Sequence, residues 1–178
     1  MFNIVKTYYL FTQYVNNVRN NFHRIWENGI IEGRLVLEEG EEFGDSELWV
    51  LREPITYFDA EYGSITVLPG MRTDGASIPK FLWAITGPPL RDSRTARPAV
   101  VHDLLYYLSD KTRFSRLDSD IIFARALNSR GVSKVKVLSY YIGVRLGGWV
   151  GWNRYKNQED SRQVAFQETA LTWFKDYV

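Results

Sequence analysis

The 178-residue chain contains no cysteine, which excludes a disulfide scaffold and a thiolate metal site. It has only two histidines, so few residues can serve as an imidazole ligand or base. Lysine and arginine number 22 against 21 acidic residues, so no basic excess predicts nucleic-acid binding. No hydrophobic run predicts a signal peptide or a transmembrane helix. These absences predict a chain made and folded in a cytoplasm.

Aromatic residues, by contrast, are abundant, with six tryptophans and eleven tyrosines. Such residues serve either a large interface or a densely packed small core. The length suits one domain that buries a core of its own.

Residues 1–28 have the pattern of one amphipathic helix that ends at Gly29. Its apolar side chains alternate between spacings of four and three residues, which is a heptad seam. The seam consists of Ile4, Tyr8, Phe11, Val15, Val18, Phe22 and Ile25. A seam of this kind needs a surface that covers it, either in its own domain or on another chain, and both remain open. His23 is expected at the surface.

Between residues 30 and 71 the apolar period changes to two, which is typical of short strands. The pattern predicts a small antiparallel sheet whose strands are separated by turns. The predicted strands are residues 33–37, 47–51, 55–58 and 64–68. The acidic run from Glu38 to Glu42 is expected to be a solvated loop rather than a metal site, because neighbouring like charges repel.

Small and polar residues dominate the next segment, residues 69–83. Asp74 and Gly75 suit a tight turn, and Ser77 suits a helix N-terminus. Residues 86–97 are then expected to be a linker that carries three arginines.

Residues 96–110 are predicted to form the central helix, with Pro98 in its opening turn. Most of its positions are apolar. His102 and Tyr106 nevertheless share one face, because they lie one turn apart, and Asp103 follows His102 directly.

The next helix, residues 115–131, has clear signals at both ends. Ser115 and Asp118 have the spacing of a capping box, and Gly131 suits the position after the last helical residue. Asp118 falls beside Arg125, near the polar side of this helix.

Asp120 instead falls within the apolar stripe of the same helix. An unpaired carboxylate buried there would cost several kcal/mol, so it needs a partner. His102 is the histidine placed to meet it. We therefore expect Asp120 to lie within hydrogen-bonding reach of His102 or Tyr106.

Two more helices are predicted, at residues 134–152 and 159–178. Gly143, Gly147 and Gly151 recur every fourth residue and form a groove that lets another helix, with the central one as the candidate, approach closely. The last helix has an aromatic stripe, made of Phe166, Ala170, Trp173 and Tyr177.

The predicted class is α+β, with a small antiparallel sheet followed by a helical core. The predicted parts are an N-terminal amphipathic helix (1–29), a core domain (30–156) and a C-terminal helix (157–178).

Four blocks of the chain together resemble an uncharacterised phage and bacterial family, domain-of-unknown-function family 1353. The blocks are residues 73–80, 99–106, 120–123 and 141–152, and the resemblance covers about residues 35–152. It implies no activity. The family's association with phages implies a virus-encoded protein, made in the host cytoplasm and carried in the virion.

The His-Asp-x-x-Tyr string, together with an aspartate on a second helix, is also similar to phospholipases of the A-two type. This resemblance implies that His102 is the general base, Asp120 its orienting partner and Tyr106 a hydrogen-bond donor to Asp120. It implies that Asp103 binds calcium, and Asp74 is the further candidate ligand.

Two functions of different classes remain open. In the first, the chain is a phage-encoded virion or assembly component, and the polar residues form a core network. It would contact other virion proteins or itself through its N-terminal heptad helix and C-terminal aromatic helix. In the second, it is a metal-assisted ester hydrolase acting on lipid of the host envelope.

Overall fold

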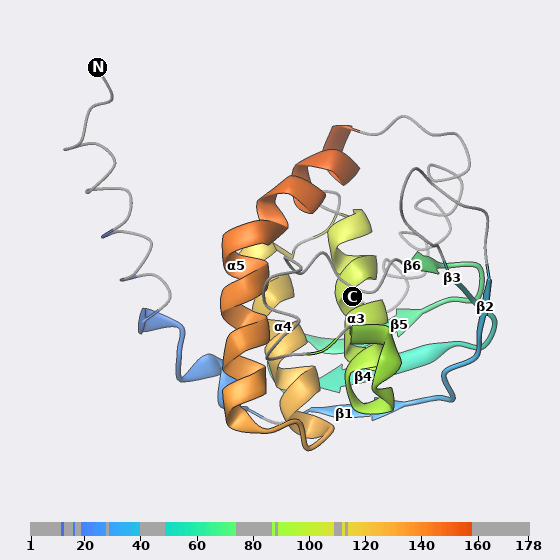
Figure 1. Cartoon of the computed structure of the whole chain (residues 1–178), viewed down its shortest axis with the longest axis horizontal. Coiled ribbons are helices and arrows are strands. Elements are labelled where there is room, and N and C mark those ends of the chain that lie inside the picture. The colour runs from blue at the N-terminus through green and yellow to red at the C-terminus, as the bar shows by residue number, and fades with distance from the viewer. Residues whose placement is uncertain are drawn as a thin grey trace.

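Helices lie on one side of the molecule and strands on the other (Figure 1). The computed structural model describes residues 12, 16, 19–27, 29–39, 49–73, 87, 89–108, 112 and 114–157, with the backbone alone for 154–157. The elements are η1 (Arg24–Trp26), β1 (Ile30–Glu32), β2 (Leu37–Glu39), β3 (Trp49–Leu51), β4 (Ile55–Asp59), β5 (Gly63–Val67), β6 (Arg72–Thr73), η3 (Pro89–Arg91), α3 (Ser93–Leu108), α4 (Arg116–Ser129) and α5 (Lys134–Asn157).

The strands form two three-stranded antiparallel sheets, in the orders β1-β4-β5 and β2-β3-β6. Residues Ile55 and Tyr57 alternate inward along β4, where they pair with Val67 and Ile65 of β5 and are fully buried. This arrangement confirms the predicted α+β class. The predicted strands at 47–51, 55–58 and 64–68 correspond closely to β3, β4 and β5.

The strand predicted at residues 33–37 is wrong in position, because β2 begins at Leu37 and contains Glu38 and Glu39. The first two residues of the acidic run are therefore in a strand rather than a solvated loop. Glu38 is held there by Arg52, whose Nε donates to its carboxylate at 2.7 Å. Residues 40–42 of the run lie outside the described residues.

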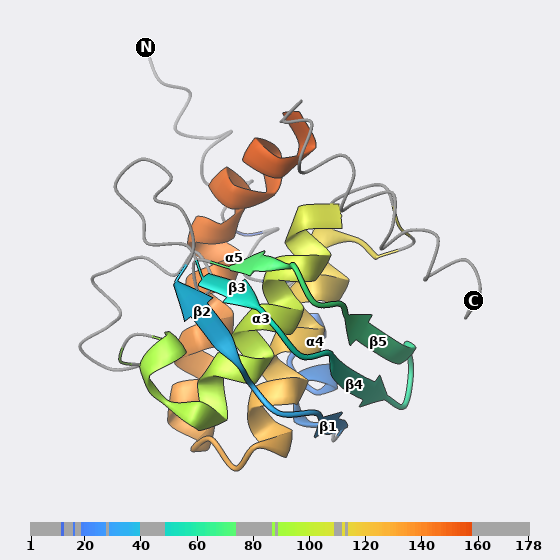
Figure 2. The same cartoon turned by 90° about the vertical axis from the view of Figure 1, so that its right-hand side faces the viewer.

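Helix α3 is the central element of the fold. It contacts β4 and β5 on one side and α4 and α5 on the other, and Figure 2 shows it behind the strands. It begins at Ser93, earlier than predicted, so Pro98 lies inside the helix and not in its opening turn. Asp92 explains this start, because its side chain accepts a hydrogen bond from the Arg94 amide at 2.9 Å. The predicted linker is shortened accordingly.

Helix α4 has both of the features that the sequence predicted for its two ends. Ser115 and Asp118 form the reciprocal capping box. At the other end Gly131 has φ of 70°, and the Val132 amide donates to the Leu127 carbonyl oxygen.

The N-terminal helix does not continue to residue 28 as predicted. Residues 21–23 form a turn and η1 follows, while Arg19 and Asn20 are helical. Ile25 is fully buried in a cluster with residues of α4 and α5. His23 is exposed, as expected. Most of the heptad seam and the whole predicted helix at 159–178 lie outside the described residues.

Helix α5 is the longest described element, with 24 residues. Within the described parts of the chain, no helix has the length and apolar character needed to cross a membrane.

Candidate active site

Asp120 is the centre of a buried polar cluster that joins the three helices. Its side chain is fully buried, and its two oxygens have different partners. Oδ1 accepts hydrogen bonds from His102 Nε2 at 3.0 Å and from the Tyr106 hydroxyl at 2.6 Å. Oδ2 accepts a hydrogen bond from Arg145 Nη1 at 2.6 Å, and Arg116 Nη1 lies 3.7 Å away. Both of the contacts expected from the sequence are therefore present.

The imidazole of His102 is held in one orientation by its neighbours. Tyr106 lies one helical turn further along α3, and the two ring centroids are 4.1 Å apart. The ring of Phe123, from α4, lies 4.7 Å away. Packing therefore keeps the Nε2 edge of the imidazole directed at Asp120.

This contact determines the role of each imidazole nitrogen. A carboxylate oxygen can only accept, so Nε2 of His102 is the donor in the bond to Asp120. Nδ1 is buried and has no hydrogen-bond partner in the described structure. Because nearly all buried polar atoms are hydrogen-bonded, an unpartnered imidazole nitrogen requires an explanation.

Asp103 lies next to this nitrogen. Its Oδ1 is 4.0 Å from His102 Nδ1, which is too far for a direct hydrogen bond. Its Oδ2 accepts a hydrogen bond from the hydroxyl of Thr73, at the end of β6. Thr73 thus brings the start of the polar segment predicted to contain Asp74 towards α3, although Asp74 itself is outside the described residues.

The side chains of Tyr106 and Arg145, which donate hydrogen bonds to Asp120, both have raised pKa values. Burial, followed by the negative charge of Asp120, raises the pKa of Tyr106, so its hydroxyl keeps its proton. Burial would lower the pKa of Arg145, but the adjacent Asp120 outweighs this effect and the pKa is raised. Both side chains therefore remain donors to Asp120 across the ordinary pH range.

Arg145 and Arg116, the two basic residues beside Asp120, were not predicted as site residues from the sequence. Arg145 had a usable signal, because it lies between Tyr141 and Gly148 on the buried face of α5. Gly148 is where α5 approaches Tyr106 most tightly, since a Cβ added there would overlap the Tyr106 hydroxyl. Helix α5 does contact the central helix α3 as predicted, but this close approach is at Gly148, which is not one of the three glycines of the predicted groove.

A metal site is not complete within the described residues, which contain no group of three histidine or acidic side chains suited to an ion. Asp103 is the described carboxylate beside His102 Nδ1. Asp74, the other candidate ligand, lies outside the described residues.

A second buried ion cluster is centred on Arg125, also on α4. Its side chain is fully buried, because η1 and the turn after β4 cover that face of α4. The sequence pattern had placed Arg125 near the polar side of the helix. Its guanidinium donates to Asp59 at 2.8 Å, Glu61 at 2.8 Å and the Arg24 carbonyl oxygen at 2.7 Å. Glu27 lies 2.5 Å from it. Every nitrogen of this guanidinium therefore has a partner.

Comparison with known proteins identifies a family for a segment that contains most of the Asp120 cluster. No curated protein and no solved structure matches the chain. One family model, described as "Protein of unknown function (DUF1353)", matches residues 49–144. This match covers more than half of the chain and includes His102, Asp103, Tyr106 and Asp120. The chain belongs to the DUF1353 family.

Proposed function

We propose that the chain is a hydrolase of phospholipid esters in which His102 is the general base. The observation that supports this proposal most strongly is the buried imidazole, with Nε2 bonded to Asp120 and Nδ1 without a partner. With its proton on Nε2, a neutral imidazole carries a lone pair on Nδ1. An aligned imidazole in this state can take a proton from water.

In the proposed reaction a water molecule bonds to His102 Nδ1. The distance of 4.0 Å from Nδ1 to Asp103 Oδ1 suits a water that bonds to both atoms. His102 takes a proton from this water as the water oxygen bonds to the ester carbonyl carbon. The alcohol then leaves as the carbon–oxygen bond breaks, and it takes the proton from Nδ1, which restores the base.

Asp120 has a positioning role in this reaction. Its negative charge stabilises the imidazolium that forms when His102 takes the proton, and the hydrogen bond to Nε2 fixes the tautomer. Tyr106 and Arg145 hold the carboxylate in place from α3 and α5.

Calcium is the ion that we propose for this reaction, with Asp103 and Asp74 as its carboxylate ligands. When bound, it would stabilise the negative charge on the ester carbonyl oxygen. Carboxylate oxygen is the ligand type that calcium prefers. The proposed substrate is phospholipid of the host envelope, and we propose that the protein is phage-encoded.

A virion or assembly component is the second candidate, and the degree of burial favours it. His102, Tyr106 and Asp120 are at most 2% exposed. A network closed in this way could fix the three helices relative to one another without performing chemistry. In this candidate residues 1–29 and 157–178 would supply contacts with other virion proteins or with a second copy.

His102→Gln separates the two candidates. The glutamine amide nitrogen can occupy the place of Nε2 and still donate to Asp120, but it leaves no base at the place of Nδ1. If the first proposal is correct, the full chain hydrolyses phospholipid in mixed micelles, and this variant is slower by about 10²–10⁴-fold. His23→Gln, which changes the exposed histidine, is the matched control and should keep full activity.

The parent protein is assayed with added calcium and with a chelator. Hydrolysis that requires calcium and is lost in Asp103→Asn supports the proposed ion. An absence of hydrolysis by the parent under both conditions would contradict the enzyme proposal and leave the assembly component as the remaining candidate.

A further inference from the structure

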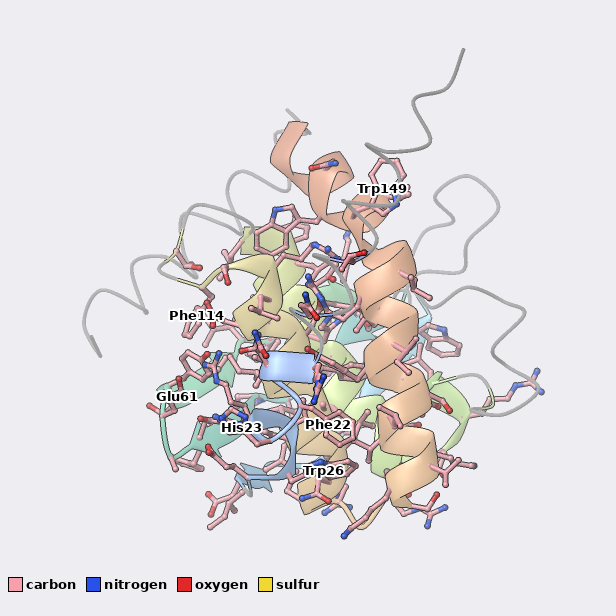
Figure 3. All side chains as sticks on the ribbon, turned by 90° about the vertical axis from the view of Figure 1, so that its left-hand side faces the viewer. Phe22, His23, Trp26, Glu61, Phe114 and Trp149 are labelled. Atoms are coloured by element: carbon pink, nitrogen blue, oxygen red, sulfur yellow. The ribbon has the colours of Figure 1, made fainter. Side chains whose placement is uncertain are left out.

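The outer face of α5 carries an exposed apolar stripe. Its large side chains have exposed fractions between 37% and 70%. They are Val135, Ile142, Leu146, Trp149 and Val150. Figure 3 shows Trp149 on this face of the molecule. A group of exposed apolar side chains along one face of a helix indicates a binding partner.

The stripe has the spacing of a heptad. Its positions alternate between four and three residues apart and form the series 135, 139, 142, 146, 149 and 153. Ser139 and Asn153 are the two polar members of this series. We call these six positions the α5 stripe; Val150 is next to it in sequence and is not one of the six.

The N-terminal seam ends beside the start of this stripe. Ile25, the last seam residue, is buried against α4 and α5. The rings of Phe22 and Trp26 pack edge to face, and their centroids are 5.6 Å apart. Lys134 Nζ, at the start of α5, lies 5.7 Å from the centroid of the Trp26 ring. Figure 3 shows Phe22 and Trp26 beside α5. The described positions before them, 12, 16, 19 and 20, are helical.

We propose that residues 4–22 of the same chain pack antiparallel along the α5 stripe. The seam series 4, 8, 11, 15, 18 and 22, read backwards, has the same spacings as the α5 stripe. Each series extends over roughly 27 Å of helix at 1.5 Å per residue, so the two match in length.

The position of Phe22 near the start of α5 determines the register. Because Phe22 packs on Trp26 and Trp26 lies beside Lys134, we place Phe22 opposite Val135, and the other pairs follow at the same spacing. The remaining pairs are Val18 with Ser139, Val15 with Ile142, Phe11 with Leu146, Tyr8 with Trp149, and Ile4 with Asn153. Five of the six pairs therefore bring together an apolar side chain from the seam and either an apolar or a small residue of the stripe.

This packing assigns the N-terminal seam to the chain's own surface. The seam and the α5 stripe cover one another, so a single contact explains why the chain has both of these apolar surfaces. A partner that binds either surface would first have to separate them.

Crosslinking of engineered cysteines tests the register, because the chain has no cysteine of its own. In the full-length double variant Val15→Cys with Ile142→Cys, a short bismaleimide reagent should join the two thiols within one chain. The control, Val15→Cys with Trp149→Cys, offsets the same pair by two helical turns, roughly 10 Å, and should react at least several-fold less. Peptide mass spectrometry identifies the crosslinked residues.

Three outcomes would overturn the proposal. They are no crosslink in the matched pair, equal yields in the matched and offset pairs, and a crosslink between two chains, which would show that a second copy occupies the stripe. Hydrogen exchange of Leu146→Asp gives a second test that does not disturb the core, since Leu146 is 51% exposed. Amides of residues 8–18 should lose protection in this variant while those of β4 and β5 keep theirs; unchanged protection at 8–18 would also overturn the proposal.

Discussion

The two buried ion clusters on α4 differ in how completely their polar atoms are paired. Around Arg125 every guanidinium nitrogen has an acceptor, and the cluster reaches the surface through Glu61 and Glu27, whose side chains are 42% and 50% exposed. The cluster around Asp120 is closed, yet two of its buried nitrogens, His102 Nδ1 and Arg145 Nε, have no hydrogen-bond partner in the described structure.

This difference separates a structural cluster from a candidate catalytic one. A fully paired cluster stabilises the contact between α4, η1 and the turn after β4, and nothing in it is left to react. A buried atom that lacks a hydrogen bond costs stability, so its presence suggests another role. Arg145 Nε can only donate, whereas the unprotonated imidazole nitrogen has a lone pair, so the contrast between the two clusters favours His102 as the reactive group.

The largest effect is expected when the closed cluster loses its carboxylate. Asp120→Ala leaves the Arg145 charge and the donors of His102 and Tyr106 without their acceptor. We expect the free energy of unfolding to fall by about 5 kcal/mol, near the upper end for a broken buried ion pair. Urea denaturation measures this. A loss below about 1 kcal/mol would show that the cluster is not held by Asp120.

Removing the centre of the paired cluster should have a smaller effect. Arg125→Ala leaves Asp59 as the fully buried carboxylate, whereas Glu61 and Glu27 can turn towards water. We expect a loss of about 3 kcal/mol by the same urea measurement. A loss greater than that of Asp120→Ala would reverse the comparison between the two clusters.

Gly148→Ala tests the packing of the closed cluster. The added methyl group overlaps the Tyr106 hydroxyl, and we expect a net loss of about 1–2 kcal/mol after the gain in helix propensity. In a Tyr106→Phe background the overlapping oxygen is absent, so the same substitution should cost less. An equal loss of stability in the two backgrounds would show that the strain does not come from the Tyr106 hydroxyl.

Asp118, in the first turn of α4, should produce a modest pH effect. Burial would raise the pKa of Asp118, but hydrogen bonds from Ser115 and Tyr62 outweigh it and hold the pKa below its usual 3.8. A lowered folded-state pKa adds stability that is fully present above the unfolded value and is lost as pH falls through the folded value. Between pH of about 5 and 2, the melting temperature should therefore fall less steeply in Asp118→Asn than in the parent. Parallel curves would contradict this assignment.

Local spacing was sufficient to predict several parts of the structure. The caps of α4 depend on residues that are three or four positions apart, and they are present as predicted. The contact of Asp120 with His102 and Tyr106 followed from the helical period and from the cost of an unpaired buried carboxylate.

Other parts depend on contacts between distant segments, which spacing does not reveal. β1 and β6 are strands only because β4 and β3 pair with them. Arg125 is buried because η1, about a hundred positions earlier, covers it. Arg145 meets Asp120 only after α5 folds back along α4, so its position among buried residues of α5 indicates that it is buried but not which carboxylate it contacts.

The most direct test of the account is the tautomer of His102, measured by long-range proton–nitrogen correlation NMR. In a His23→Gln background His102 is the single remaining histidine, so its two nitrogen signals are unambiguous. We predict that at neutral pH Nε2 carries the proton and Nδ1 has the shift of an unprotonated nitrogen. A spectrum with a proton on Nδ1 would contradict the proposal, because His102 could not then accept a proton from water.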